Sequence, residues 1–209
     1  MNRREALRAA VGLIAASSAT AFGADDDPRD VTAPIRAFYD SLLRVMRRAK
    51  ELGIPGRYDT LAPAILASFD LAAMTRISVG PRWNSFPAEQ KAALIEAFTR
   101  MTIATYANRF DGYTGERFDV DPAVETRKTG SIVHTRIIQS SGVAVPLNYL
   151  MRKSGATWKI VDVYLAGAIS ELATKRSEFG AILDSGGAKM LIDTLQQQTD
   201  KLLRPAPSS

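Results

Sequence analysis

The sequence predicts an α+β fold, in which a helical N-terminal half is followed by an antiparallel sheet and by closing helices. Over residues 31–110, apolar side chains recur every three or four residues, which is the spacing of amphipathic helices. Over residues 117–165 the pattern changes to alternation between short turn signals, as in strands joined by hairpins. Helical spacing returns over residues 169–203, as two helices that Gly186 and Gly187 separate.

Four helices are expected in the N-terminal half, over residues 31–52, 59–68, 71–77 and 87–110. The first carries an apolar stripe beside a basic group. Asp70 is placed to cap the third helix, which Gly80 and Pro81 then stop. Pro87 suits the first position of the fourth helix.

Five strands are expected, over residues 117–120, 124–128, 132–139, 143–151 and 158–165. Gly130, Gly142 and Gly155 mark hairpin turns, so the sheet is expected to be an antiparallel meander. Pro146 lacks the N–H for a ladder hydrogen bond, which favours an edge strand or a bulge at that point.

The first 23 residues have the layout of a cleavable signal peptide. Arg3 and Arg4 precede a small and apolar run over residues 9–16, which is shorter than the roughly 20 residues that span a membrane. Ala21 suits a signal peptidase, and the paired arginines leave both the twin-arginine and the general secretory route open. We expect export to the periplasm.

Residues 24–204 are expected to form a single domain, and residues 205–209 a disordered tail. The chain is 46% hydrophobic and 23% charged, which is typical of folded domains. It has no cysteine, so its core must hold the fold without disulfides. The net charge of +5 is a mild excess, more typical of ordinary solubility than of an anionic partner.

The chain shows no pattern of catalytic, metal-binding or cofactor-binding residues. His134 is the only histidine and is expected to be structural or exposed. Basic residues interleave with acids without aromatic stacking positions, which argues against a nucleic-acid partner. Asp162 and Tyr164 share one strand face and could serve a small pocket enzyme, although an aspartate there more often anchors a helix or turn.

Short motifs in a shared order resemble the MlaC family of periplasmic lipid carriers, also called toluene-tolerance proteins. The motifs are Phe69-Asp70-x3-Met74, Gly80-x2-Trp83, Pro87-x-Glu89-Gln90, Trp158-Lys159-Ile160-Val161-Asp162-Val163, Gly167, Arg176-Ser177-Glu178-Phe179 and Gly186-Gly187. The segment 170–179 further resembles the hopanoid-biosynthesis-associated branch, often named HpnM.

The resemblance implies a fold similar to nuclear transport factor 2, with helices packed over a curved antiparallel sheet of four to five strands. It implies a hydrophobic cavity for phospholipid or hopanoid, with no catalytic residue and no cofactor. The implied role is to shuttle lipid between inner and outer membranes as the substrate-binding component of an ABC-type system. The implied partners are an inner-membrane ABC transporter with a ring-forming lipid-binding subunit and an outer-membrane lipoprotein complex.

Ten side chains are candidates for the wall of such a cavity: Phe38, Leu42, Met46, Leu66, Phe98, Met101, Val145, Leu147, Tyr149 and Tyr164. Core and pocket residues look alike in a sequence, so plain core packing stays open for each of them. Three functions remain in view. They are a lipid carrier, an envelope scaffold or transporter accessory without its own ligand, and a small pocket enzyme.

Overall fold

The computed structural model describes residues 27–204 and confirms the α+β fold class. Its elements in chain order are α1 (Pro28–Arg47), α2 (Ala49–Ser68), α3 (Leu71–Val79), the 3-10 helix η1 (Gly80–Ser85), α4 (Ala88–Arg109), β1 (Arg117–Arg127), β2 (Gly130–Ile138), β3 (Ala144–Ser154), β4 (Thr157–Leu165), β5 (Ile169–Ser170) and α5 (Glu171–Leu203). The predicted signal peptide and the tail after residue 204 lie outside the described residues. No helix within residues 27–204 has both the length and the apolarity needed to cross a membrane.

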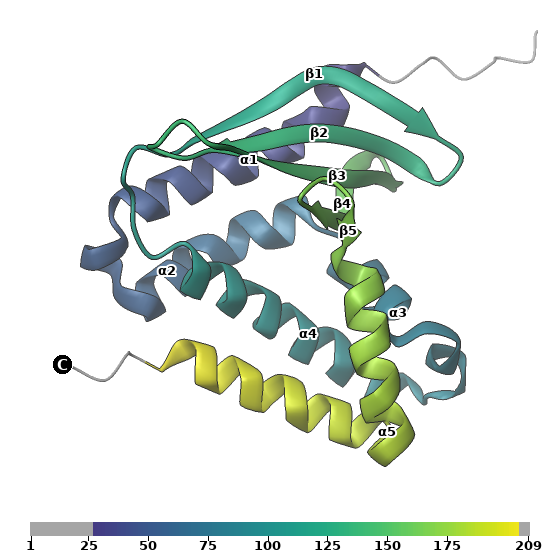
Figure 1. Cartoon of the computed structure of the whole chain (residues 1–209). Helices are drawn as coiled ribbons and strands as arrows, with labels where there is room; N and C mark the ends of the chain where they lie inside the picture. Colours follow the sequence, from purple (N-terminus) through teal and green to yellow (C-terminus); the bar gives the residue numbers. More distant parts are fainter. Residues whose placement is uncertain (1–26, 205–209) are drawn as a thin grey trace, which may run out of the picture.

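The strands form one antiparallel meander, in the order β1-β2-β3-β4-β5 (Figure 1). The strands predicted over residues 117–120 and 124–128 are in fact one strand, β1. Its register against β2 shifts between those two parts, where the Ala123 N–H donates to the Asp121 carboxylate over 2.9 Å. A bulge bends a strand without ending it, and it interrupts the alternation of side chains. That interruption is what divided the strand in the sequence pattern.

Pro146 lies in the middle strand of the sheet, so its prediction as part of an edge strand is wrong. β3 pairs with β2 on one side and with β4 on the other. Pairing with β4 begins only at Leu147, opposite Leu165, so the strand has no neighbour on that side at Pro146. A missing N–H is tolerated where a strand lacks a neighbour. The bulge between β3 and β4 lies further along, between Leu150 and Met151.

The single helix predicted over residues 31–52 is divided. α1 ends at Arg47, because Arg48 leaves helical geometry with φ −113° and ψ 15°, and α2 begins at Ala49. Within α2, Gly53 has a φ of 59° and redirects the chain through a conformation that favours glycine. Both segments bury side chains in the same core, so apolar spacing continues across the break.

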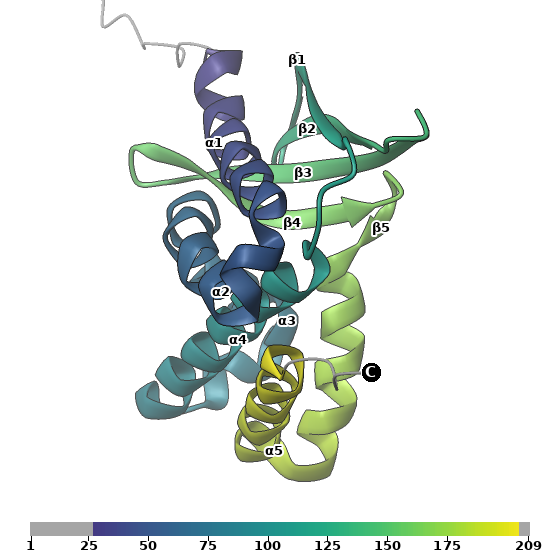
Figure 2. The ribbon, with the colours of Figure 1, turned by 90° about the vertical axis from the view of Figure 1, so that its left-hand side faces the viewer.

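The long helices all lie on one face of the sheet (Figures 1 and 2). α1 runs along the sheet, and α2, α3 and α5 also contact it through β4. α4 packs against these three helices. α5 bends at Gly186 and Gly187, as predicted, so that its second part runs beside α4. The opposite face of the sheet carries a small separate cluster of Ile132, Leu150 and Val161. The main core therefore lies between the sheet and the helices.

Candidate functional site

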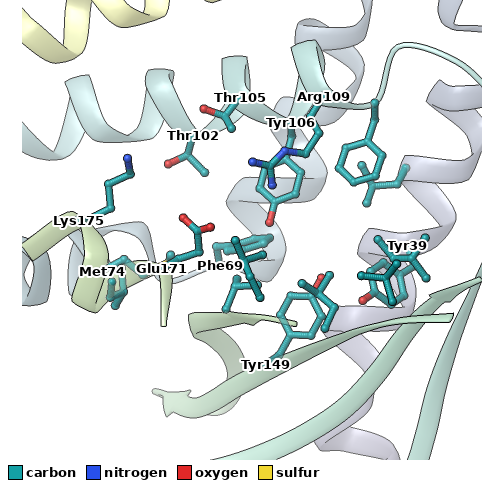
Figure 3. A pocket seen from close by; sticks show the side chains of 18 of the residues that line it. Tyr39, Phe69, Met74, Thr102, Thr105, Tyr106, Arg109, Tyr149, Glu171 and Lys175 are labelled. Carbon is teal, nitrogen blue, oxygen red and sulfur yellow. The ribbon is translucent and has the colours of Figure 1, made fainter. Parts of the chain in front are cut away.

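A cavity of about 280 Å³ lies inside the main core, between the inner face of the sheet and the helices (Figure 3). Most of its wall is apolar. Leu42 of α1, Met101 of α4 and Leu147 of β3 contribute from three sides, and Leu172 closes it from the first turn of α5. Side chains alternate along a strand, and the alternate residues Val145, Leu147 and Tyr149 of β3 and Val163 and Leu165 of β4 line the cavity, together with Pro146.

Aromatic rings form the inner part of this wall. Phe69 and Tyr106 both pack edge-on against Phe38, with ring centroids 5.0 and 5.1 Å away, while Tyr39 stacks on Phe118 at 4.4 Å. Such pairs stabilise a core beyond the area they bury. The aromatic part of the wall is therefore held in place by its own packing.

One tyrosine hydroxyl at the cavity belongs to a hydrogen-bond chain of the protein itself. The Tyr39 hydroxyl lies 2.7 Å from the Thr135 Oγ1, and the Thr135 hydroxyl donates to the carbonyl oxygen of Leu147. A hydroxyl carries one hydrogen, so Tyr39 must be the donor to Thr135. Burial raises the pKa of Tyr39 to about 12, with the bond to Thr135 acting in the opposite direction.

Two other tyrosine hydroxyls at the cavity make no hydrogen bond to any described residue. The Tyr149 hydroxyl is fully buried and unpaired, and the Tyr106 hydroxyl is also without a hydrogen bond. Burial raises the pKa of both side chains well above the ordinary value for tyrosine. Figure 3 shows Tyr149 rising from β3 and Tyr106 reaching down from α4 towards the same space.

Charged side chains gather where α4 and α5 border the cavity. Arg109 from the last turn of α4 and Glu171 and Lys175 from the start of α5 belong to its lining. Lys175 is bonded to Glu178 over 2.9 Å, whereas Arg109 forms no ion pair with a residue of the described range. The cavity therefore has a mostly apolar wall, and we call Arg109, Glu171 and Lys175, which Figure 3 labels on the α4 and α5 sides, its charged border.

The buried carboxylate of Asp162 fixes the start of α5 and with it this charged border. It accepts hydrogen bonds from the Ser170 hydroxyl over 2.6 Å and from the Leu172 N–H over 3.1 Å. Ser170 caps the helix by accepting from the Ala173 N–H over 2.9 Å. A negative charge at a helix N-terminus is favourable. Asp162 is thus an anchor for a helix.

Six of the ten candidate wall residues lie in the wall of this cavity: Leu42, Phe98, Met101, Val145, Leu147 and Tyr149. The other four do not. Phe38 and Met46 are buried in the core behind the wall, and Leu66 is 54% exposed on α2. Tyr164 packs against the separate cluster on the opposite face of the sheet, because it follows Val163, which faces the cavity.

Several lining residues were missed by the sequence reasoning, among them Tyr39, Tyr106, Arg109, Glu171 and Lys175. The two tyrosines belong to helices whose apolar positions were recognised, so their spacing was an available signal. The charged residues offered none, because a charge near a helix end looks like ordinary solvated surface. Only the packing of α5 against the sheet brings them to the cavity.

The described residues hold no metal-binding group of three or more His, Asp or Glu side chains. His134 is about half exposed on β2, with its Nε2 atom 3.4 Å from the Glu125 carboxylate. Asp162 and Tyr164 lie outside the cavity lining, so they do not form the acid and donor pair of a pocket there. The cavity offers apolar contact, hydroxyl donors and a charged border.

Comparison with known proteins connects this architecture to one family. The family model described as MlaC protein matches residues 36–197. The intermembrane phospholipid transport system binding protein MlaC of Haemophilus influenzae is 27% identical over 127 residues, and the match spans 59% of this chain and 59% of that relative.

A solved structure has the same fold. It is a phospholipid-binding protein from Ralstonia solanacearum in complex with a phospholipid, and it superposes with a TM-score of 0.73 at 20% sequence identity. The superposition covers 84% of this chain and 99% of that chain. Since the family model spans most of the sequence, this chain belongs to the MlaC protein family.

Proposed function

We propose that this protein binds a diacyl phospholipid by its acyl chains and carries it through the periplasm between the inner and outer membranes. The observation that supports this proposal most is the apolar cavity between sheet and helices, with its charged border at α4 and α5. Acyl chains fit the first feature and a polar headgroup fits the second. The two similar proteins, one a phospholipid transport system binding protein and the other solved in complex with a phospholipid, agree with this ligand class.

Apolar burial supplies enough free energy for such binding. Each methylene removed from water contributes about 0.8 kcal/mol. Ten buried methylenes therefore contribute about 8 kcal/mol, which corresponds to a dissociation constant near the micromolar range before the costs of ordering. The cavity of about 280 Å³ is small beside typical ligand pockets of roughly 300–1,000 Å³. We therefore expect its walls to move apart when two chains enter.

The cellular context of this function belongs to the same proposal. The mature chain begins between Phe22 and Asp25, after cleavage of an export signal. Lipid passes between an inner-membrane ABC transporter with a ring-forming subunit and an outer-membrane lipoprotein complex. The resemblance of residues 170–179 to the hopanoid-associated branch makes a hopanoid the second candidate cargo.

The Leu147→Glu variant tests whether the cavity holds the lipid. Leu147 is half-buried and lines the cavity, so a carboxylate there occupies the space of an acyl chain. We expect the variant to keep a cooperative melting transition, because an empty cavity can hydrate the charge, and to be purified without lipid. Leu66→Glu is the matched control, because Leu66 is 54% exposed and lies outside the lining.

Lipid extraction and mass spectrometry of both variants give the readout. Lipid-free Leu147→Glu beside lipid-loaded Leu66→Glu supports the carrier function. A folded Leu147→Glu with full lipid occupancy contradicts the assignment of this cavity, and an unfolded one shows that Leu147 is core. A wild-type protein without lipid favours the scaffold function, and turnover of a lipid favours the enzyme.

A further inference from the structure

Tyr106 and Tyr149 bring two free hydrogen-bond donors into the mostly apolar wall of the cavity. Their hydroxyls come from opposite walls, one from α4 and one from β3, and neither bonds to a described residue (Figure 3). The Tyr149 hydroxyl is fully buried, whereas Tyr106 is half-buried. A buried polar group without a partner destabilises a protein, and native structures contain few of them. A purely hydrocarbon ligand would leave both donors unpaired.

Tyr39, the third tyrosine in the cavity wall, has a hydroxyl that is already hydrogen-bonded within the protein. Tyr39 donates to Thr135, which in turn donates to the Leu147 carbonyl. The ring of Tyr39 packs edge-on against the ring of Tyr149 with centroids 5.8 Å apart, and the two phenols interact electrostatically. The Tyr149 hydroxyl nevertheless has no partner within hydrogen-bond distance among the described residues. The protein therefore provides a hydrogen-bond partner for one of these three hydroxyls and leaves the other two available to a ligand.

The two free hydroxyls lie further inside the cavity than the charged border. Tyr106 and Arg109 are three residues apart on α4, so they share one side of that helix, and both line the cavity. Figure 3 shows the Tyr106 hydroxyl between Arg109, on the α4 side, and Tyr149, which rises from the sheet. The order from the α4 side towards the sheet is thus charge, the Tyr106 hydroxyl and then the Tyr149 hydroxyl.

That order matches the order of groups in a diacyl glycerophospholipid. Its charged headgroup is followed by two ester carbonyls, which accept hydrogen bonds, and then by the acyl chains. We propose that the hydroxyls of Tyr106 and Tyr149 donate hydrogen bonds to the ester carbonyl oxygens of the bound lipid, so that the protein selects ester-linked over ether-linked glycerolipids. This inference rests on the proposed function, because it concerns the same cavity and the same ligand.

The experiment compares dipalmitoyl phosphatidylethanolamine with its di-O-hexadecyl ether analogue, which lacks both carbonyl oxygens. Each lipid competes with a fluorescent phospholipid for the delipidated protein. A hydrogen bond of ordinary strength corresponds to about a tenfold change in affinity. Two such bonds act together, so we expect the wild type to bind the diester about a hundredfold more tightly than the diether.

Phenylalanine variants assign this preference to individual hydroxyls. Tyr149→Phe and Tyr106→Phe should each weaken diester binding by about tenfold while leaving diether binding unchanged. Tyr164→Phe is the matched control: it removes a phenol from the same sheet, at a position that lies outside the cavity lining. Its ratio of diester to diether affinity should equal that of the wild type. Thermal melts of all three variants report on folding.

The outcomes separate this inference from the proposed function. Equal affinity of the wild type for diester and diether overturns the carbonyl contact while leaving the lipid carrier intact. A diester preference that stays as large as that of the wild type in both the Tyr149→Phe and the Tyr106→Phe variant also overturns it. Failure of the wild type to bind either lipid overturns the proposed function itself.

Discussion

Individual side chains show why the pocket was only partly predictable. Val145, Leu147 and Tyr149 alternate along β3, and alternation places them on one face, so their common position followed from the sequence. Leu66 and Tyr164 were misplaced because each stands one position beyond a buried residue. One step rotates a side chain by about 100° around a helix and to the opposite face of a strand.

The buried phenol of Tyr39 predicts a loss of stability in alkali. Its pKa is raised to about 12 by burial, whereas in the unfolded chain it is about 10. Between pH 10 and pH 12 the folded protein therefore keeps a proton that the unfolded chain loses. The contribution of the neutral phenol to the free energy of unfolding is complete below pH 10 and disappears as the pH rises through 12. A difference of this size corresponds to about 2–3 kcal/mol in the free energy of unfolding.

Denaturant unfolding measured from pH 9 to pH 12 checks this expectation. Tyr39→Phe should reduce the alkaline loss of stability without abolishing it, because burial also raises the pKa values of Tyr106 and Tyr149. A Tyr39→Phe variant with the same pH dependence as the wild type would show that Tyr39 is not responsible.

The types of the helices and strands were predictable from the local spacing of residues, but several of their boundaries were not. The bend of α5 at Gly186 and Gly187 was visible as a glycine pair, whereas the break at Arg48 was not, because no helix-breaking residue marks it. The bulge in β1 likewise changed the alternation without a turn signal. A local sequence pattern reveals a break that a special residue such as glycine causes. A break that depends on packing is determined by the rest of the molecule and leaves no local pattern.

The bend of α5 yields a matched pair of glycine substitutions. Gly187 has a φ of 64°, whereas Gly180 lies within the helical part of α5, and a Cβ atom at either site meets no other atom within 4 Å. The two sites differ in backbone conformation and not in available space. Gly187→Ala should therefore destabilise the protein by about 1 kcal/mol, while Gly180→Ala should stabilise it by about 0.5–1 kcal/mol.

Differential scanning calorimetry of the two variants provides the measurement. The midpoint should fall for Gly187→Ala and rise for Gly180→Ala. Equal shifts of the same sign would mean that the conformation of Gly187 does not define the bend.

For the whole molecule, the cavity is a product of long-range packing. Its wall joins α1, α4, the sheet and the start of α5, so residues far apart in sequence become neighbours. Apolar periodicity indicates that each element buries one side, but it does not say whether the opposed surfaces meet or leave a space. The family resemblance, rather than the spacing of residues, is what suggested a cavity from the sequence.

Native mass spectrometry of the wild-type protein, purified from the envelope fraction without detergent, tests whether the protein carries phospholipid. We expect a mature chain that carries one phospholipid, released as a diacyl lipid on collisional activation. The cavity lies within one chain, so one lipid for each chain is the expected limit. A protein isolated only in the lipid-free form, which also fails to take up phospholipid from vesicles, would contradict the account.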